Sequence, residues 1–397
     1  MKNLNDSSYE INPTLKQYLL ITLGVCALIT AVSYFHAPVR FWVNILINNF
    51  YFVSLALSGL FFLALQNITN SSWMRTYQRI PQAMTAFLPW GLGLMLLGFL
   101  GHHTLYEWTH TAEVLKDPVL IKKTAYLNVT FFLIRLVVYF ALWITASRLI
   151  NVLMNSWPSS PKQQEAHSGK LARVSAITMV VFALSFALFS YDSLMSVEPH
   201  WFSTIYSVYT FSGLFVSGIA FITLSLLVLR LFGHLDGIVT RDHFHDLGKW
   251  MFGMSTFWAY IWFCQYMLIW YSNIPEETEY YILRDHDNWT WLFWSNFVIC
   301  FAVPFFILLK RESKRNYIAL AGVSIVLLVG HWVDLYTLVA PKIYEHYKIL
   351  AVIGPYEILS AFLFASGYVL IFLKKLQTRK LIVDSDPYLE EGSHLHQ

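Results

Sequence analysis

Ten long apolar runs dominate the sequence and limit what it can fold into. A helix rises about 1.5 Å per residue, so a run of roughly 18 residues or more can cross a hydrocarbon core of about 30 Å. Because lipid offers no water to backbone amides, each such run must be helical. We therefore predict an all-α polytopic membrane protein with about ten transmembrane helices, over 17–35, 41–66, 84–103, 126–150, 171–190, 203–230, 246–270, 289–309, 317–337 and 352–373.

The composition excludes a water-soluble fold. The chain is 56% hydrophobic and 13% charged, whereas soluble domains carry about 25% charged residues. Its net charge of +3 comes without a basic face, so we expect no nucleic-acid partner. Because Cys26, Cys264 and Cys300 lie far apart inside apolar runs, we also expect no metal site, iron–sulfur cluster or other cofactor held by this chain itself.

The distribution of Lys and Arg predicts how the chain is oriented. Of these 27 residues, 19 lie in or beside the N-terminus, the even-numbered connections and the C-terminus, and 7 lie beside the odd-numbered connections. Positive residues are retained on the cytoplasmic side, so we predict that both termini are cytoplasmic. The predicted cytoplasmic parts are an N-terminal tail over 1–16, a linker over 151–170 and a C-terminal tail over 374–397. The last part of the C-terminal tail, "DSDPYLEEGSHLHQ", is expected to be disordered or to contact a partner.

The predicted outer stretch "SYDSLMSVEPHWFSTIYSVYTFSG" holds Asp192, Glu198 and His200, with no Lys or Arg. Two interpretations are open for these acidic residues. They form either a solvated loop or a docking surface for extracytoplasmic partners.

A set of polar residues is predicted near the outer ends of the helices within 41–190. Arg135 lies inside an apolar run, where a charge needs a partner or a function. We propose Asn48, His102, His103, Arg135 and Asp192 as candidates for a quinol site, because an imidazole and a carboxylate can accept phenolic protons. The alternatives are an interhelical ion pair for Arg135 and simple contact with interfacial water for the histidines and tyrosines.

A second polar set includes His331 and Asp334, which are three residues apart and so share a helix face. Together with Tyr260, Gln265 and Glu357, they are candidates for a proton path across the membrane. The alternative is a chain of satisfied interhelical hydrogen bonds.

Four motifs are similar to a known family of respiratory membrane subunits. They are "YDSLMSVEPHWFSTIYSVYTFSG", "HDLGKWMFGMSTFWAYIWFCQYMLIWYSNIPEE", "GHWVDLYTLVAP" and the tail motif "DPYLEE". They resemble the NrfD-like integral membrane subunits of alternative complex III, a bacterial quinol:cytochrome c oxidoreductase, and the ActF-type among them. The resemblance extends from about residue 170 to the end, and the earlier residues fit mainly in helix count.

The resemblance implies two four-helix bundles, over 41–190 and 203–337, with flanking helices over 17–35 and 352–373. It implies a bacterial inner-membrane subunit that scaffolds a quinol oxidoreductase and has no redox centre of its own. The implied partners are a paralogous NrfD-like membrane subunit, a periplasmic iron–sulfur subunit and c-type cytochromes. These partners would hold the Fe–S clusters and haem c, with menaquinol or ubiquinol as substrate.

Two other functions are compatible with the sequence. A secondary transporter would also have about ten helices with buried polar groups, although Pro89, Pro304 and Pro355 form no matched pattern between the two halves. A purely structural membrane anchor of a cytochrome complex is the other alternative.

Overall fold

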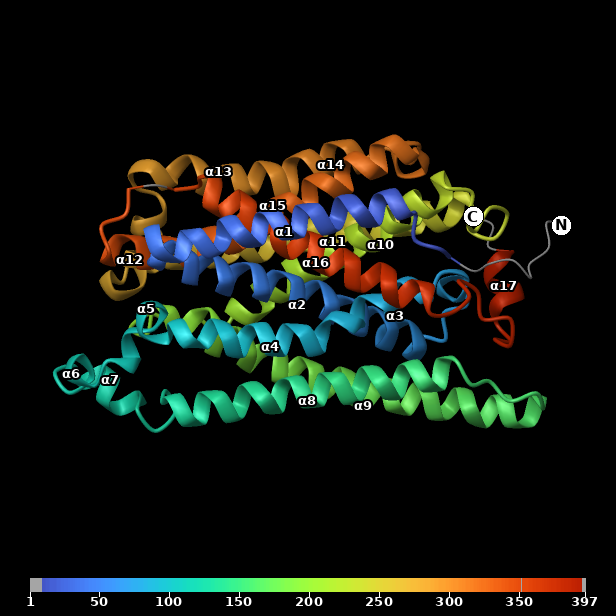
Figure 1. Ribbon diagram of the computed structural model, residues 1–397, viewed down its shortest axis with the longest axis horizontal. Coiled ribbons are helices and arrows are strands. Elements are labelled where there is room, and N and C mark those ends of the chain that lie inside the picture. The colour runs from blue at the N-terminus through green and yellow to red at the C-terminus, as the bar shows by residue number, and fades with distance from the viewer. Residues whose placement is uncertain (1–8, 351, 395–397) are drawn as a thin grey trace.

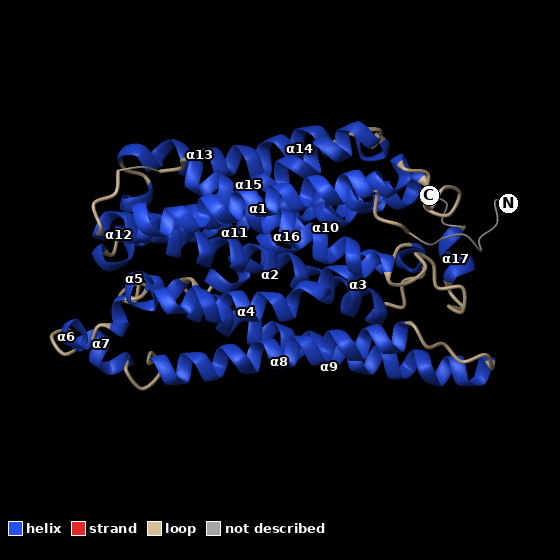
Figure 2. Cartoon of the chain, viewed as in Figure 1, coloured by secondary structure: helices blue, strands red, loops and turns tan. Residues whose placement is uncertain are grey.

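The structure is a computed structural model that describes residues 9–350 and 352–394, apart from the side chain of Asp287. These residues form helices and connecting loops and contain no β-strand (Figure 2). The α-helices in chain order are α1 (Pro13–His36), α2 (Pro38–Ile68), α3 (Arg79–Met84), α4 (Leu88–Gly98), α5 (His102–Leu105), α6 (Thr111–Val114), α7 (Pro118–Lys123), α8 (Val129–Met154), α9 (Pro161–Ser193), α10 (Tyr206–Leu231), α11 (Arg241–Ser272), α12 (Pro275–Arg284), α13 (Thr290–Phe297), α14 (Val303–Leu308), α15 (Tyr317–His346), α16 (Pro355–Gln377) and α17 (Leu389–Ser393).

The predicted polytopic helical membrane protein is confirmed. Within the described ranges, nine helical spans are long and apolar enough to cross a membrane, and each overlaps one of the predicted runs. The remaining run, 246–270, lies within α11, which has 32 residues and is therefore long enough to cross. Its many Trp, Tyr and polar residues make it less apolar than the other nine.

Two of the nine spans are interrupted helices. The span Arg79–Leu105 is built from α3, α4 and α5 joined by short 3₁₀ turns. The span Thr290–Leu308 joins α13 to α14 through a π-helical turn over Val298–Ala302, immediately before Pro304. A proline has no backbone N–H to donate to the preceding turn, which favours such a local change of hydrogen-bond pattern.

Helix α2 lies at the centre of the molecule and α1 at its periphery. In the most apolar 18-residue stretch of each helix, 94% of the residues are buried in α2 and 17% are buried in α1. Helix α2 packs against α1, α3, α4, α8, α9, α10, α15 and α16. Because α2 and α10 touch directly, the two predicted bundles, 41–190 and 203–337, meet along these helices. The division into two bundles itself stays a prediction.

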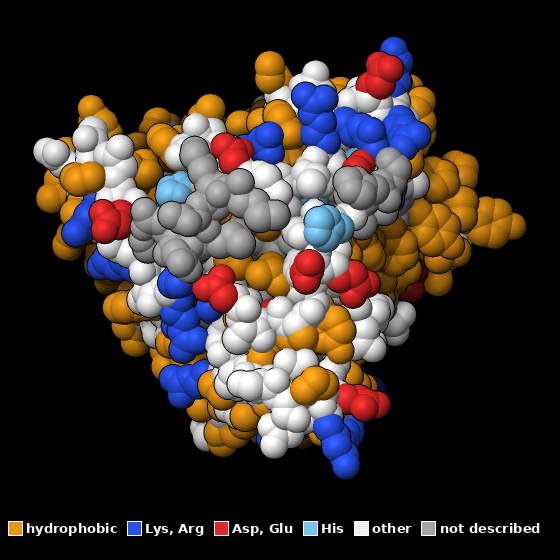
Figure 3. Space-filling model, turned by 90° about the vertical axis from the view of Figure 1, so that its right-hand side faces the viewer, with side chains coloured by type: hydrophobic (Ala, Val, Ile, Leu, Met, Phe, Trp, Pro, Cys, Tyr) orange, Lys and Arg blue, Asp and Glu red, His pale blue; other side chains and the backbone are white. Residues whose placement is uncertain are grey.

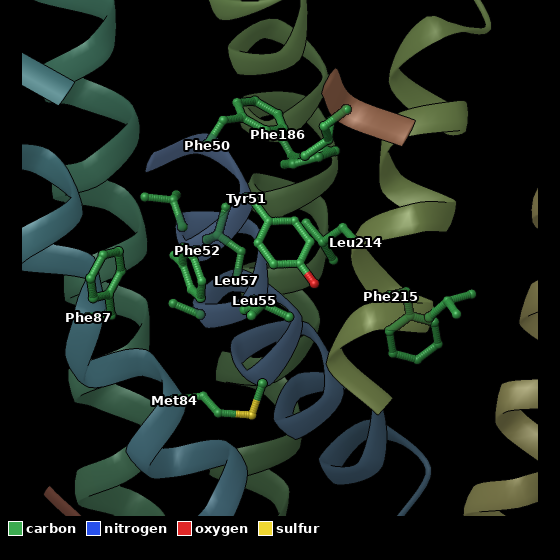
Figure 4. Close-up of a cluster of buried hydrophobic side chains, with 14 of the residues drawn as sticks. Phe50, Tyr51, Phe52, Leu55, Leu57, Met84, Phe87, Phe186, Leu214 and Phe215 are labelled. Atoms are coloured by element: carbon green, nitrogen blue, oxygen red, sulfur yellow. The ribbon is translucent and has the colours of Figure 1, made fainter. Parts of the chain in front are cut away.

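Aromatic side chains fill the contacts around α2 (Figure 4). Phe50 stacks on Phe189 of α9 with ring centroids 5.0 Å apart. Figure 4 shows Met84 and Phe87 on one side of α2, and Leu214 and Phe215 of α10 on another. The apolar core therefore continues across α2 from one group of helices to the next.

The described chain begins and ends at the same end of the helix assembly, here called the terminal end (Figure 1). The connections α5–α7 and the helix α12 lie at the opposite end, here called the loop end. Lys and Arg side chains gather in several groups on the terminal end (Figure 3). Which side of a membrane each end faces stays a prediction.

The structure shows how two predicted segments of the terminal end are folded, and their assignment as a cytoplasmic linker and a cytoplasmic tail stays a prediction. The predicted linker 151–170 is mostly helical, because α8 continues to Met154 and α9 begins at Pro161. The C-terminal tail is not disordered as far as residue 394, and it packs on its own chain. Asp386 lies buried 3.7 Å from an Arg75 nitrogen, and α17 packs on the 3₁₀ turn Trp73–Thr76. The buried apolar residues before it anchor the tail: Leu381, Ile382 and Val383. Residues 395–397 and 1–8, which belong to the predicted tails, lie outside the described residues.

Candidate functional site

Arg135 and Asp192 form a buried ion pair between α8 and α9. The Arg135 Nε and Nη2 atoms donate to the two Asp192 oxygens over 2.8 and 3.0 Å. Tyr139 donates a further hydrogen bond of 2.9 Å to the same carboxylate, and the remaining Arg135 nitrogen donates to the Tyr126 carbonyl. The fork-to-carboxylate geometry satisfies both charges. This is the interhelical ion pair that the sequence left open as one interpretation of Arg135.

Glu198 is neutralised in a comparable way by Arg284 of α12. The two side chains form a buried salt bridge, and Arg284 also donates to the carbonyls of Thr337, Leu338 and Tyr280. Burial alone lowers the pKa of Arg284, but Glu198 and Tyr280 outweigh it and leave the pKa raised. Arg284 is therefore charged at neutral pH, and it ties α12 to α15.

The carboxylates of the proposed docking stretch are thus largely buried. Asp192 is 2% exposed and Glu198 8% exposed. His200 lies at the surface and contacts Asp117, at the N-terminus of α7. The stretch needs no cation of its own, because Arg135 and Arg284 supply the positive charges from elsewhere in the chain.

The other quinol-site candidates do not contact this ion pair. Asn48 hydrogen bonds to Ser360 of α16 and accepts from the Trp332 indole, over 3.0 and 2.8 Å. His102 bonds to the Phe99 carbonyl, and the exposed His103 bonds to Thr109. The structure therefore brings together Arg135 and Asp192, whereas Asn48 and the adjacent rings of His102 and His103 have other hydrogen-bond partners.

The carboxylate of Asp334 lies at the centre of a second polar cluster. Tyr209 of α10 donates to one of its oxygens, and the Trp258 indole of α11 donates to the other over 3.2 Å. Across the described residues, no Lys or Arg nitrogen lies within 4 Å of this carboxylate, and the Nδ1 atom of His331 lies 3.9 Å away. Arg284, which is paired with Glu198, lines the same small cavity as Asp334. Asp334 is thus held by neutral donors in place of a cation.

Within the part of the chain that the structure describes, neither ring nitrogen of the buried His331 has a hydrogen-bond partner. The side chain is 2% exposed, and its ring stands edge-on to Trp258. It is the fifteenth residue of α15, so helical rise places it roughly 21 Å from the start of that helix. Buried polar atoms are nearly always hydrogen bonded, and a partnerless imidazole at this depth indicates a place for a water molecule or a proton-exchanging group.

Small cavities lie beside this cluster and toward the loop end. One of about 10 Å³ is lined by His331, Asp334 and Ser217, and another of about 20 Å³ by Asp334, Gln265, Tyr280 and the charged Arg284. Each is close to the minimum size that holds one water molecule. A third, of about 100 Å³, is lined by Tyr280, by the buried Glu198 and by other residues of the loop end: His200, Glu276, Glu279 and Lys342. The first two cavities share Asp334 as a lining residue and the last two share Tyr280, and the three together are called the cavity series here.

The remaining proton-path candidates divide among three environments. Gln265 is buried and lines the second cavity with Asp334. Tyr260 is 62% exposed on the outside of α11, away from the cluster. Glu357 lies at the start of α16, where it accepts from Arg40 Nε over 2.9 Å and from the Gly354 amide over 2.8 Å. Glu357 is therefore another paired carboxylate.

Sequence reasoning missed several residues that complete these clusters. Tyr139, Tyr209 and Trp258 each donate to a buried carboxylate, and Arg284 and Arg40 each neutralise one. The only available signal was the rarity of cations in this chain. It could have marked Arg40 and Arg284 as pairing partners, but nothing in the sequence specified which carboxylates they reach.

The apolar spans and these contacts describe an integral membrane protein with a buried carboxylate–imidazole pair, and among the described residues no Lys or Arg nitrogen lies within 4 Å of that carboxylate. No protein-family model matches the chain, and a search of curated proteins found no match.

Proposed function

We propose that this chain is the membrane-embedded, NrfD-like subunit of a respiratory quinol oxidoreductase, and that it carries protons through the Asp334–His331 cluster. Electrons would pass from quinol to cytochrome c, or to a similar periplasmic acceptor, through the Fe–S clusters and haem c of partner subunits. The chain would scaffold the assembly in the bacterial inner membrane, with both termini in the cytoplasm.

The observation that carries this proposal is the buried carboxylate without a cation. Ionisable groups inside a membrane are costly and are retained at ion and proton pathways. Asp334 can change its protonation state without leaving an unpaired guanidinium behind, which Asp192, Glu198 and Glu357 cannot do. The cavity series supports a proposed route of exchange from Asp334 toward the loop end.

Each residue on the proposed route has a stated role. Tyr209 and Trp258 hold the Asp334 carboxylate in place by hydrogen bonding. His331 exchanges a proton with Asp334 through the cavity that they share. Gln265 and Tyr280 line the next cavity and lead toward Glu198 and the acidic surface.

The assembly is tested by purifying the protein in mild detergent through a tag on this chain. We expect a c-type haem band in the reduced-minus-oxidised spectrum, with an iron–sulfur subunit and a second multi-helix chain identified by mass. A colourless protein with no companions would overturn the respiratory proposal and favour a secondary transporter. Haem-bearing companions together with variants that show no coupling defect would leave a structural anchor.

The proton role is tested with Asp334→Asn in proteoliposomes that hold the purified complex. We expect proton movement coupled to quinol oxidation to fall at least about tenfold, because the amide has no titratable proton at this position. Tyr260→Phe is the matched control, since it also removes a candidate proton-carrying group but lies on the outer surface of α11. Coupling that persists in Asp334→Asn, or that falls equally in Tyr260→Phe, would contradict the assigned route.

A further inference from the structure

A basic pocket lies at the terminal end, where three membrane-spanning segments begin or end. Arg79 stands at the start of α3, Arg148 lies near the end of α8, and Lys375 and Arg379 lie at the end of α16. The pocket has a volume of about 270 Å³, much larger than the single-water cavities of the interior. These four cations line it together with uncharged residues, and no Asp or Glu is among its lining residues.

Among the described residues, no acidic side chain pairs with any of these four cations. Arg79 donates to the Gln82 side chain and to the Lys380 carbonyl, each over 3.0 Å, and to the Asn155 side chain. Over the described ranges, no carboxylate oxygen lies within 4 Å of Arg148, Lys375 or Arg379. Elsewhere in this protein, buried or half-buried arginines are paired with carboxylates. Arg79 is half-buried and the other three cations are exposed, and an anion between these four positive charges would relieve their mutual repulsion.

The position of the pocket indicates what kind of anion it takes. Its walls follow the ends of apolar helices, so it lies where lipid headgroups meet the hydrocarbon. Val152 lines the pocket and is 63% exposed, and Leu149, one turn earlier on α8, is 51% exposed. A ligand in the pocket therefore has an apolar surface beside it along which acyl chains can lie.

We propose that this pocket binds the phosphate headgroup of an anionic glycerophospholipid. Arginine guanidinium groups suit phosphate because they present two parallel donors, and basic pockets between membrane helices are recognised lipid-headgroup sites. The lipid phosphate would bridge Arg79 of α3, Arg148 of α8 and the two cations of α16. A bound lipid would thereby join the ends of three helices.

The test is native mass spectrometry of the detergent-purified, delipidated full chain with phosphatidylglycerol or phosphatidylcholine. We expect phosphatidylglycerol to bind and phosphatidylcholine to bind at least about tenfold more weakly. The double variant Arg148→Ala/Lys375→Ala should weaken phosphatidylglycerol binding by roughly 25-fold, on the order of fivefold for each cation removed. Equal binding of the two lipids, or unchanged binding to the double variant, would overturn the proposal.

The matched control is Lys170→Ala/Lys374→Ala, which removes the same charge from exposed positions outside the pocket. This control should bind phosphatidylglycerol to within about twofold of the unmodified protein, because distant exposed charges are screened by salt. Both double variants lose two positive charges, so a difference between them reports the position of the charges. If the pocket variant does not fold, the charge-retaining Arg148→Lys/Lys375→Arg variant is used, and it must bind phosphatidylglycerol. The last measurement uses inorganic phosphate as a competitor. If phosphate displaces phosphatidylglycerol and binds as tightly as the lipid does, the site takes free phosphate and the lipid assignment is wrong.

Discussion

The carboxylates of Asp192 and Asp334 are both buried at membrane-spanning helices, but their surroundings differ in one decisive respect. Asp192 receives two hydrogen bonds from Arg135, which is itself buried. Asp334 receives hydrogen bonds from a phenol and an indole and has an imidazole nearby. The first pair joins two helices and cannot lose its charge cheaply. The second can gain or lose a proton without leaving a buried cation unpaired.

The largest expected difference is in stability between Asp192→Asn and Asp334→Asn. The first variant leaves the Arg135 guanidinium buried without its carboxylate, which costs about 3–5 kcal/mol. The second keeps the side-chain shape and leaves no cation unpaired, so the change should stay within about 1 kcal/mol. Unfolding free energy in detergent, measured with denaturant, checks both values.

A double variant without either charge tests the same comparison. Arg135→Met/Asp192→Leu removes both charges and should recover most of the stability lost in Asp192→Asn, because well-packed apolar residues can replace a buried ion pair. Equal losses for Asp192→Asn and Asp334→Asn would show that the two carboxylates are not different in kind.

A smaller effect is expected where α10 approaches His331. A methyl group added in Gly213→Ala would lie 3.1 Å from the His331 Nδ1 atom, inside the cavity that His331 and Asp334 both line. We expect a loss of about 1 kcal/mol and slower hydrogen exchange at the His331 ring carbon, because less water reaches it. Mass spectrometry of histidine exchange measures the second effect.

Gly93→Ala is the control for that substitution, because nothing lies within 4 Å of the added methyl group. It should stabilise α4 by about 0.5–1 kcal/mol through the glycine-to-alanine helix preference and leave exchange at His331 unchanged. Unchanged exchange in Gly213→Ala would show that water does not reach His331 through this cavity.

The smallest expected effect is a pH response at the surface contact between Asp117 and His200. The hydrogen bond from His200, followed by those from the Val119 and Leu120 amides, lowers the pKa of the Asp117 carboxyl. When folding lowers the pKa of a carboxyl, its ionised form stabilises the folded state. That stability is complete above the unfolded-state pKa of about 4 and is lost as the pH falls through the folded-state pKa. Amide exchange at Val119 and Leu120 should therefore accelerate on acidification below that range.

Asp117→Asn supplies the control for this titration. The amide side chain can still cap α7 but does not titrate, so its exchange rates should follow the intrinsic pH dependence alone. The same acceleration in wild type and variant would assign the response to another group.

The apolar runs by themselves determined the helices and their approximate ends, because lipid leaves the backbone no alternative to internal hydrogen bonding. The sequence also identified Arg135, Asp192, His331 and Asp334 as residues that need an explanation, because charges at membrane depth are costly. A spacing of three residues was enough to place His331 and Asp334 on one helix face.

Only the tertiary structure decided which residues meet across helices. Arg284 reaches Glu198 from 86 positions away, and Arg40 reaches Glu357 from 317 positions away. The basic pocket likewise assembles residues of α3, α8 and α16 that no local pattern connects. Periodicity specifies the face of a helix on which a residue lies, but the partner of that face depends on how the helices pack. Among the described residues, that packing places Asp192, Glu198 and Glu357 beside arginines and Asp334 beside a phenol, an indole and an imidazole.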